Sequence, residues 1–322
     1  MNSSEAPPTA RPRLSFVIPC YNEQEVLGEL HRRVKAAGGS LDATYEIILV
    51  NDGSSDGTLD VMVSLAATDP TLVVVDLSRN HGHQLALSAG LQVSRGERVL
   101  VLDADLQDPP ELVGEMMALM DGGSDVVYAQ RRTRRGDAPM KRLACAAFYR
   151  VLTWLADRPI PLDTGDFRLL SRRVVDEIVR MPECHRFIRG MVSWVGYKQV
   201  PFAYDRKGRF AGETKYPLIR LVTLALDGIV TSSTRPLMLA TYAGGLFALL
   251  CVGLIVYALY SWLFVGETPQ GWTSLMIIVT LLGSVQLLVL GIVGQYVGRV
   301  HEQVRGRPIF IIRDIIRGTP NA

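Results

Sequence analysis

Short apolar runs and longer amphipathic stretches alternate along the chain before Arg235. Runs rich in Val, Ile and Leu predict strands, and apolar residues at helical spacing predict helices between them. The expected strands are 14–19, 45–50, 72–77, 98–102 and 125–129. The expected helices are 23–37, 59–67, 84–93 and 110–121. This alternation predicts an α/β domain with a Rossmann-like, mostly parallel sheet and helices on both faces.

The pattern changes after Arg235, where two long apolar stretches follow each other. Neither 236–266 nor 268–298 contains a charged residue. A helix that crosses the hydrocarbon core of a membrane needs about 20 apolar residues, so each stretch is long enough. We therefore expect a hairpin of two transmembrane helices, at about 237–264 and 273–297, within a membrane region that spans 236–298.

Positive charges flank this hairpin on both sides. They are Lys215, Arg220 and Arg235 before it, and Arg299, Arg305, Arg307, Arg313 and Arg317 after it. Lys and Arg residues next to membrane spans are retained in the cytoplasm. We therefore expect a multi-pass protein of the cytoplasmic (inner) membrane, with its globular domain and both termini in the cytoplasm.

The remaining segments complete the expected domain organisation. Residues 1–12 are polar and proline-rich, with no apolar signal core, and predict a disordered tail before a globular domain at 13–216. Segment 217–235 predicts an interfacial helix, and 299–322 predicts a cytoplasmic C-terminal tail. Within that tail, 310–316 alternates apolar and charged residues. For both amphipathic pieces, a position in the headgroup plane and a helix packed on the soluble domain remain open.

Composition supports a membrane protein and narrows its partners. The chain has 322 residues, of which 48% are hydrophobic, and its mean hydropathy is +0.19, too apolar for a simple soluble enzyme. A formal net charge of only +2 does not favour a nucleic acid partner. The cysteines have no close pair, so neither a zinc site nor a disulfide framework is indicated. They are Cys20, Cys145, Cys184 and Cys251.

Polar clusters follow four of the predicted strands, at 19–23, 51–58, 78–83 and 103–110. Parallel α/β sheets bind ligands beyond the carboxyl ends of their strands, so these clusters predict the functional site. Asp103 and Asp105 come directly after a buried strand and project to the same side. Two such carboxylates suit a hard divalent cation, Mg²⁺ or Mn²⁺, with Gln107 as a further oxygen ligand. Neither a dinucleotide fingerprint nor a P-loop is present.

Several motifs together resemble the family-two glycosyltransferases with the GT-A fold, and within them the polyprenyl-phosphate glycosyltransferases. The group includes dolichol-phosphate mannose synthase and the bactoprenol glucosyltransferases. The motifs are VIPCYNE, VNDGSSDGT, LSRNHGHQLALSAG, DADLQDPPE, DTGDFRLLSR, GETKYP and the two apolar stretches. The QxxRW motif of processive synthases is absent. The resemblance implies a GT-A catalytic domain followed by a two-helix transmembrane hairpin.

The resemblance also implies a reaction. A hexosyl group, with glucose favoured, would pass with inversion from a nucleotide diphosphate sugar, with UDP favoured, to polyprenyl (undecaprenyl) phosphate. Three alternatives remain: another sugar (mannose, N-acetylglucosamine or an aminoarabinose derivative), a non-catalytic membrane scaffold, and a processive synthase. The family contains oligomers, which favours a homo-oligomer and suggests a tetramer.

By position, the resemblance assigns roles to individual residues. The nucleotide-sugar pocket would be lined by Pro19, Tyr21, Glu23, Asp52, His83, Asp103 and Ala104. The metal would be held by Asp103, Asp105 and Gln107. The acceptor phosphate would be bound by Arg131, Arg142, Arg209 and Lys215. His83 stands where related sequences often carry lysine.

The catalytic aspartate of the family falls at Asp166, with Asp163 as its rival. A lipid phosphate has a second pKa of about 6 and needs little deprotonation at neutral pH. Asp166 would then orient the acceptor, or stabilise positive charge at the sugar carbon. A purely structural ion pair with Arg168 is the remaining interpretation.

Overall fold

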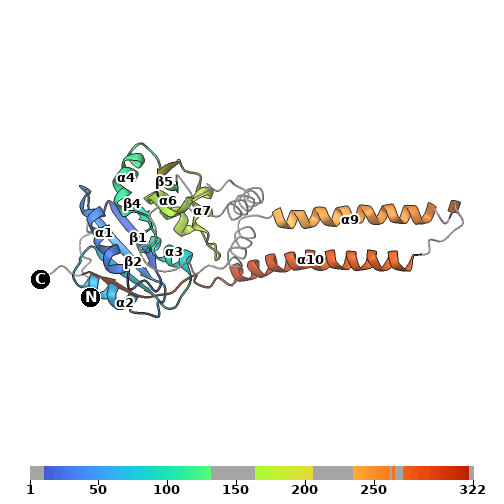
Figure 1. Cartoon of the computed structure of the whole chain (residues 1–322), viewed down its shortest axis with the longest axis horizontal. Coiled ribbons are helices and arrows are strands. Elements are labelled where there is room, and N and C mark those ends of the chain that lie inside the picture. The colour runs from blue at the N-terminus through green and yellow to red at the C-terminus, as the bar shows by residue number, and fades with distance from the viewer. Residues whose placement is uncertain (1–10, 132–163, 206–234, 261–262, 265–270, 319–322) are drawn as a thin grey trace, which may run out of the picture. The chain divides into compact units, whose positions relative to one another are not determined.

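The computed structural model describes residues 11–131, 164–205, 235–260, 263–264 and 271–318. The described strands form one eight-stranded sheet in the order β7-β5-β6-β4-β1-β2-β3-β8. Figure 1 shows helices packed around this sheet. The strands are β1 Leu14–Cys20, β2 Tyr45–Asn51, β3 Leu72–Leu77, β4 Arg98–Val101, β5 Val126–Arg131, β6 Thr164–Ser171, β7 Gln199–Tyr204 and β8 Ile312–Arg317.

The centre of the sheet is parallel, as the sequence predicts. β1 pairs in parallel with β2 and β4, β2 pairs in parallel with β3, and β5 pairs in parallel with β7. β6 and β8 are antiparallel to their neighbours. The mostly parallel α/β fold is therefore confirmed. The helices of this domain are α1 Leu27–Gly39, α2 Thr58–Ala66, α3 His83–Val93, the 3-10 turn η1 Pro110–Leu112, α4 Val113–Asp121, α6 Arg172–Arg180 and α7 Ile188–Val195.

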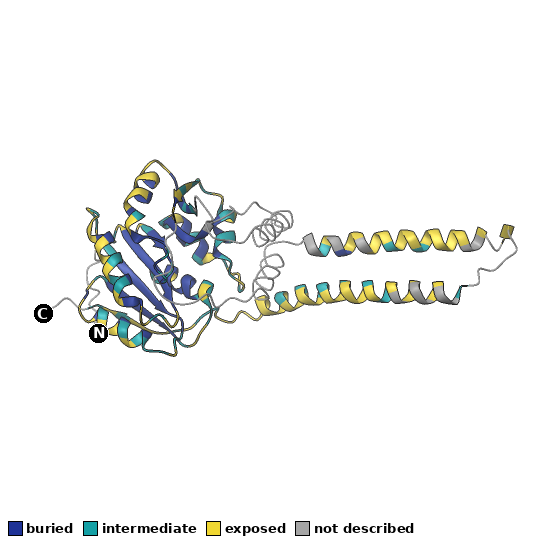
Figure 2. Cartoon of the chain, viewed as in Figure 1, coloured by how far each residue is buried: buried dark blue, intermediate teal, exposed yellow. Residues whose placement is uncertain are grey.

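Helices cover both faces of the sheet because successive strand residues point to opposite sides. In β1, Phe16 and Ile18 lie in one buried cluster, whereas Val17 lies in the other. Apolar side chains of α1, α2 and α4 complete the first cluster, and those of α3, α6 and α7 complete the second. Figure 2 shows the central strands buried between these layers. The rigid sheet places the loops after β1 to β4 along one edge.

Strand β6 brings a distant segment to that edge. It runs antiparallel to β4, and the register pairs Arg98 with Ser171 and Val101 with Arg168. Extending this register by two residues sets Asp103 opposite Asp166. The TGDF segment (164–167) therefore meets the DAD segment because of strand pairing, although no strand was expected at residues 164–171.

The C-terminal segment differs from its expected form. Residues 310–316 were expected as an amphipathic helix or a surface-lying piece, but Ile312–Arg317 is strand β8, paired antiparallel with β3. The expected helix is wrong because this segment forms its backbone hydrogen bonds with β3, with a register shift between Asp76 and Leu77. Ile312 packs against one buried cluster and Ile316 against the other, while Arg313 and Asp314 are exposed.

Two long apolar helices, α9 Arg235–Tyr260 and α10 Trp272–Val304, form a second unit of the chain. Their most apolar windows, Ala240–Tyr257 and Leu281–Val304, have mean hydropathies of 1.9 and 1.6. Most of their described side chains are exposed (Figure 2), including Leu249 and Leu287. Exposed apolar surface of this extent is unfavourable in water, so both helices are candidate membrane spans.

Candidate active site

The loops after β1 and β2 are tied together by side chains. The Asn22 carboxamide oxygen accepts the Ser55 amide at 2.8 Å, and the Glu23 amide donates to Thr58 Oγ1 at 2.9 Å. These contacts explain why α1 begins at Leu27, four residues after the start expected from its apolar spacing. Residues 21–26 belong to the site's edge rather than to the helix.

Asp52 ties the next pair of loops. Its Oδ1 accepts the His81 amide at 2.7 Å, and its Oδ2 accepts the Gly82 amide at 2.9 Å. Burial raises the pKa of Asp52, and the two amide hydrogen bonds offset that rise only in part. Gly53, at φ +63°, packs against the Arg79 backbone, where a side chain would not fit. Loop 78–83 is thus fixed by residues at the end of β2.

The other residues expected in the nucleotide pocket lie along the same edge. Pro19 is buried within β1, one residue before its end. Tyr21 is 48% exposed, so its ring is accessible to a ligand. Ala104 is buried between the two aspartates of the DAD motif.

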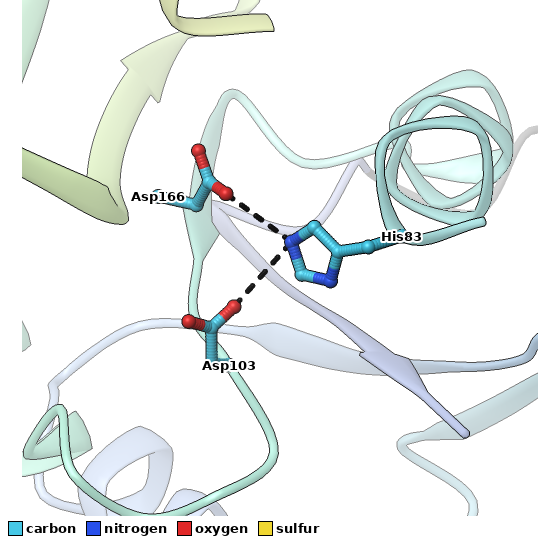
Figure 3. A group of neighbouring side chains, drawn as sticks. All are labelled: His83, Asp103 and Asp166. Atoms are coloured by element: carbon cyan, nitrogen blue, oxygen red, sulfur yellow. Dashed lines mark hydrogen bonds and ion pairs between the residues drawn. The ribbon is translucent and has the colours of Figure 1, made fainter. Parts of the chain in front are cut away.

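His83, Asp103 and Asp166 form the centre of the site (Figure 3). Each offers one ligand atom, and these three atoms lie within 4.8 Å of one another. His83 Nε2 is 3.2 Å from Asp166 Oδ2 and 3.5 Å from Asp103 Oδ1. Burial lowers the pKa of His83, but the hydrogen bond to Asp166 and the charges of both carboxylates outweigh it and raise that pKa.

Asp166 is 3% exposed and is held from three sides. Arg189, on α7, donates Nε to Oδ1 at 2.7 Å and Nη2 to Oδ2 at 3.2 Å. Gln84, on α3, donates Nε2 to Oδ2 at 3.2 Å. Burial alone would raise the pKa of Asp166. The hydrogen bond from His83 and the adjacent Arg189 guanidinium overcome burial and hold that pKa well below its ordinary value. Asp166 is therefore ionised at neutral pH.

Arg168 is not the ion-pair partner of Asp166 in the described part of the chain. Its Nη2 donates to the Gly165 carbonyl oxygen at 2.9 Å, and the side chain is 4% exposed. Burial lowers the pKa of Arg168 to about 10, against the attraction of the Asp166 charge. The partner that sequence reasoning missed is Arg189, which lies 23 residues further along the chain.

Asp103 has the chemistry of a cation ligand. Within the described residues its buried Oδ1 has no hydrogen-bond partner, and its ion-pair contact is His83 Nε2 at 3.5 Å. Burial raises the pKa of Asp103 to about 6; the charge of His83 opposes the rise, and the neighbouring carboxylates add to it. A buried carboxylate oxygen among like charges is costly unless a cation neutralises it. The residues present therefore fit a divalent metal ion.

The structure does not group the three expected metal ligands, Asp103, Asp105 and Gln107, in the way that the sequence predicts. Among the described His, Cys, Asp and Glu side chains, Asp103 clusters with His83 and Asp166, and Asp105 is outside this group. Asp105 Oδ1 accepts the Gln107 amide at 3.1 Å, across Leu106, whose φ is +58°. This turn directs the segment after β4 along the edge of the site.

The residues expected to bind the acceptor phosphate are mostly outside the described residues. Arg131 is the last residue of β5, and the structure describes its backbone only. Outside the described ranges lie Arg142, Arg209, Lys215 and the rival aspartate Asp163. The expected interfacial helix at 217–235 also lies outside them, except for Arg235, the first residue of α9.

Known proteins match the chain closely. The family model described as Glycosyl transferase family 2 matches residues 15–179. An uncharacterized glycosyltransferase of Bacillus subtilis, YkcC, is 44% identical over 93% of this chain and 93% of its own. The SfII prophage-derived bactoprenol glucosyl transferase of Shigella flexneri is 36% identical over 96% of this chain and all of its own, 100%. The chain belongs to glycosyltransferase family 2 and is a glycosyltransferase.

Among solved structures, glucosyl-3-phosphoglycerate synthase from Mycobacterium tuberculosis resembles the chain at a TM-score of 0.47 and 18% identity. The likeness covers 69% of this chain and 78% of that one. That crystal holds Mn²⁺, UDP-glucose and phosphoglyceric acid. The similarity is too distant for its ligands to bear on the residues of this chain.

Proposed function

We propose that the protein transfers a hexosyl group from a nucleotide diphosphate sugar to polyprenyl phosphate, with inversion at the sugar carbon. The observation that carries this proposal is the match along nearly the whole chain to proteins named bactoprenol glucosyl transferases, at 35–36% identity. That match takes in both candidate membrane spans, which would hold the enzyme beside a lipid acceptor. Glucose and UDP are the favoured sugar and nucleotide, and undecaprenyl phosphate is the favoured acceptor.

The edge residues suit the binding of the donor. Tyr21 offers an accessible ring to the base, and the loops carrying Asp52 and His83 would enclose the nucleotide, together with Pro19, Glu23, Asp103 and Ala104. Asp103 would hold the metal, with Asp105 and Gln107 as the further ligands expected by position. Mg²⁺ or Mn²⁺, when bound there, would supply positive charge to the leaving diphosphate.

Asp166 would act as a carboxylate rather than as a base. Its low pKa makes it a poor proton acceptor at neutral pH, and the lipid phosphate is already largely dianionic. One phosphate oxygen would form the bond to the sugar carbon while the bond to the nucleotide diphosphate breaks. Positive charge develops at that carbon, and an ionised Asp166 would stabilise it or orient the acceptor. Arg131, Arg142, Arg209 and Lys215 would bind the acceptor phosphate.

The fold supports a cytoplasmic location for the catalytic domain. The chain leaves the sheet domain before α9 and rejoins the same sheet at β8, after α10. Two crossings return a chain to the side from which it started. The flanking arginines favour the cytoplasm for that side, where nucleotide sugars are made.

A cysteine-labelling experiment tests this topology. In a variant whose four native cysteines are replaced, a cysteine at Glu267 should react with an impermeant thiol reagent added outside intact cells. A cysteine at the exposed Arg307 should react only after the membrane is permeabilised. If the cysteine at position 307 were labelled from outside and the cysteine at position 267 were not, the catalytic domain would lie outside the cell. Its proposed cytosolic donor would then be on the other side of the membrane.

A donor screen tests the proposed reaction and its sugar. Membranes containing the protein would receive polyprenyl phosphate and, separately, radiolabelled nucleotide derivatives of glucose, mannose, N-acetylglucosamine and aminoarabinose. We expect the glucose label to enter the lipid fraction as a single lipid-linked sugar. Transfer of another sugar would change the donor and keep the reaction class. Polymer would indicate a processive synthase, and the absence of transfer from every donor would indicate a scaffold.

The oligomeric state is a separate prediction. A homo-oligomer is expected, with a tetramer as its form.

A further inference from the structure

Strand β8 carries an arginine to the carboxyl edge of the sheet. Arg313 Nη2 donates to the Ser78 carbonyl oxygen at 2.7 Å, and Nη1 donates to Asp76 Oδ2 at 3.2 Å. The backbone reinforces this contact, because the Ser78 amide donates to the Ile311 carbonyl oxygen at 2.9 Å. Ser78 is the first residue of the 78–83 loop, so Arg313 holds that loop where it leaves β3.

Asp76 extends the same contact to a second loop. Its Oδ1 accepts Asn51 Nδ2 at 2.7 Å, and the Asn51 carboxamide oxygen accepts the Ser54 amide at 3.1 Å. A continuous chain of hydrogen bonds therefore runs from Arg313 through Asp76 and Asn51 to the 51–54 loop. The two loops joined in this way carry Asp52 and His83.

Arg313 also balances the buried negative charge of Asp76. Asp76 is 3% exposed, and within the described residues Arg313 is its ion-pair partner. The Arg313 side chain is 60% exposed, so solvent screens the pair in part, but its loss still leaves the buried Asp76 charge uncompensated, which is destabilising locally. The remaining neutral donor, Asn51, would then face an unpaired carboxylate, and both loops would lose their common anchor.

We propose that Arg313 is a positioning residue of the donor site: it fixes the loops that carry Asp52 and His83. The strand that follows the second apolar helix thereby completes the catalytic domain. The inference rests on the proposed function where it names the donor. It gives Arg313 a role in the site beyond that of a flanking charge.

The test uses hydrogen–deuterium exchange on the full-length protein in detergent. Arg313→Met should speed amide exchange at residues 78–82 by about tenfold or more, because the loop loses a charged hydrogen bond. In transfer assays, KM for the nucleotide sugar should rise about tenfold, with kcat within about twofold. Arg317→Met is the matched control, since Arg317 pairs with Val73 at the far end of β8, and neither readout should change.

A second variant keeps the test decisive if Arg313→Met does not fold. Arg313→Lys retains the charge but lacks the planar fork that serves two acceptors, so a smaller increase in exchange at 78–82 is expected. Exchange equal to wild type in the folded variants overturns the proposal. Faster exchange with an unchanged KM overturns its link to the donor. A wild-type enzyme without transfer activity overturns the proposed function, and the exchange measurement still decides the role of Arg313.

Discussion

Asp166→Asn should lower kcat by about 10²-fold or more, with the affinity for the nucleotide sugar changed by less than about threefold. The substitution keeps the shape of the side chain and removes the full negative charge that the proposed reaction sets beside the reacting carbon. Losses of this size are usual for groups that stabilise charge in a transition state. Steady-state kinetics gives kcat, and titration calorimetry with the nucleotide sugar gives the affinity.

The pH dependence separates a charge from a base. Because the pKa of Asp166 lies well below its ordinary value, the carboxylate is ionised throughout the neutral range. Raising the pH should therefore leave the asparagine variant impaired, whereas a missing base would be partly replaced as the acceptor ionises unaided. Asp60→Asn, the same change at an exposed position on α2, is the control. A folded Asp166→Asn enzyme with near-normal kcat would rule out Asp166 as the catalytic aspartate, and Asp163 would be tested next.

Removal of divalent metal should lower transfer by about 10³-fold or more, and Mg²⁺ or Mn²⁺ should restore it. A metal that neutralises a leaving diphosphate contributes several kcal/mol to the transition state, and each 1.36 kcal/mol is tenfold in rate. Asp103→Asn should have a similar effect, because it removes the charge of the carboxylate whose buried Oδ1 has no hydrogen-bond partner. Transfer assays with excess chelator, and Mn²⁺ binding followed by electron paramagnetic resonance, measure the two effects.

Asp105→Ala tests the ligand set expected from the motif. If Asp105 binds the metal together with Asp103, this variant should also lose transfer and Mn²⁺ binding while it still folds and inserts in the membrane. Asp60→Asn should behave as wild type in both assays. Full activity of Asp103→Asn and Asp105→Ala in excess chelator would contradict a metal-dependent mechanism.

The central strands of the sheet could be predicted because each one has a local sequence pattern. β1 to β4 each contain at least three consecutive apolar residues, and the polar residues that follow them mark one edge. β6 was missed because TGDFRLLS contains buried polar residues, Asp166 and Arg168, within the strand. β8 was missed because its strand partner, β3, lies more than 200 residues earlier, and the mixture of apolar and charged residues in 310–316 suggested an amphipathic helix or a membrane surface.

The sequence predicted which acidic residues belong to the site, but not which residues contact them. Motif positions placed Asp103 and Asp166 at the same edge, and the register of β4 and β6 explains their approach. The residues that hold Asp166 ionised could not be read from spacing. Arg189 and Gln84 come from two different helices, and only the packing of α3 and α7 on one face of the sheet brings them together.

The most direct test of the proposed reaction is mass spectrometry of the lipid product. Purified full-length protein would be incubated with UDP-glucose, undecaprenyl phosphate and Mg²⁺ or Mn²⁺. We expect undecaprenyl phosphate that carries one hexose, formed in step with release of UDP, and formed about 10²-fold or more slowly when Asp166→Asn replaces the wild type. Unmodified lipid after incubation with folded wild-type protein that binds UDP-glucose would contradict transfer of glucose to a polyprenyl phosphate.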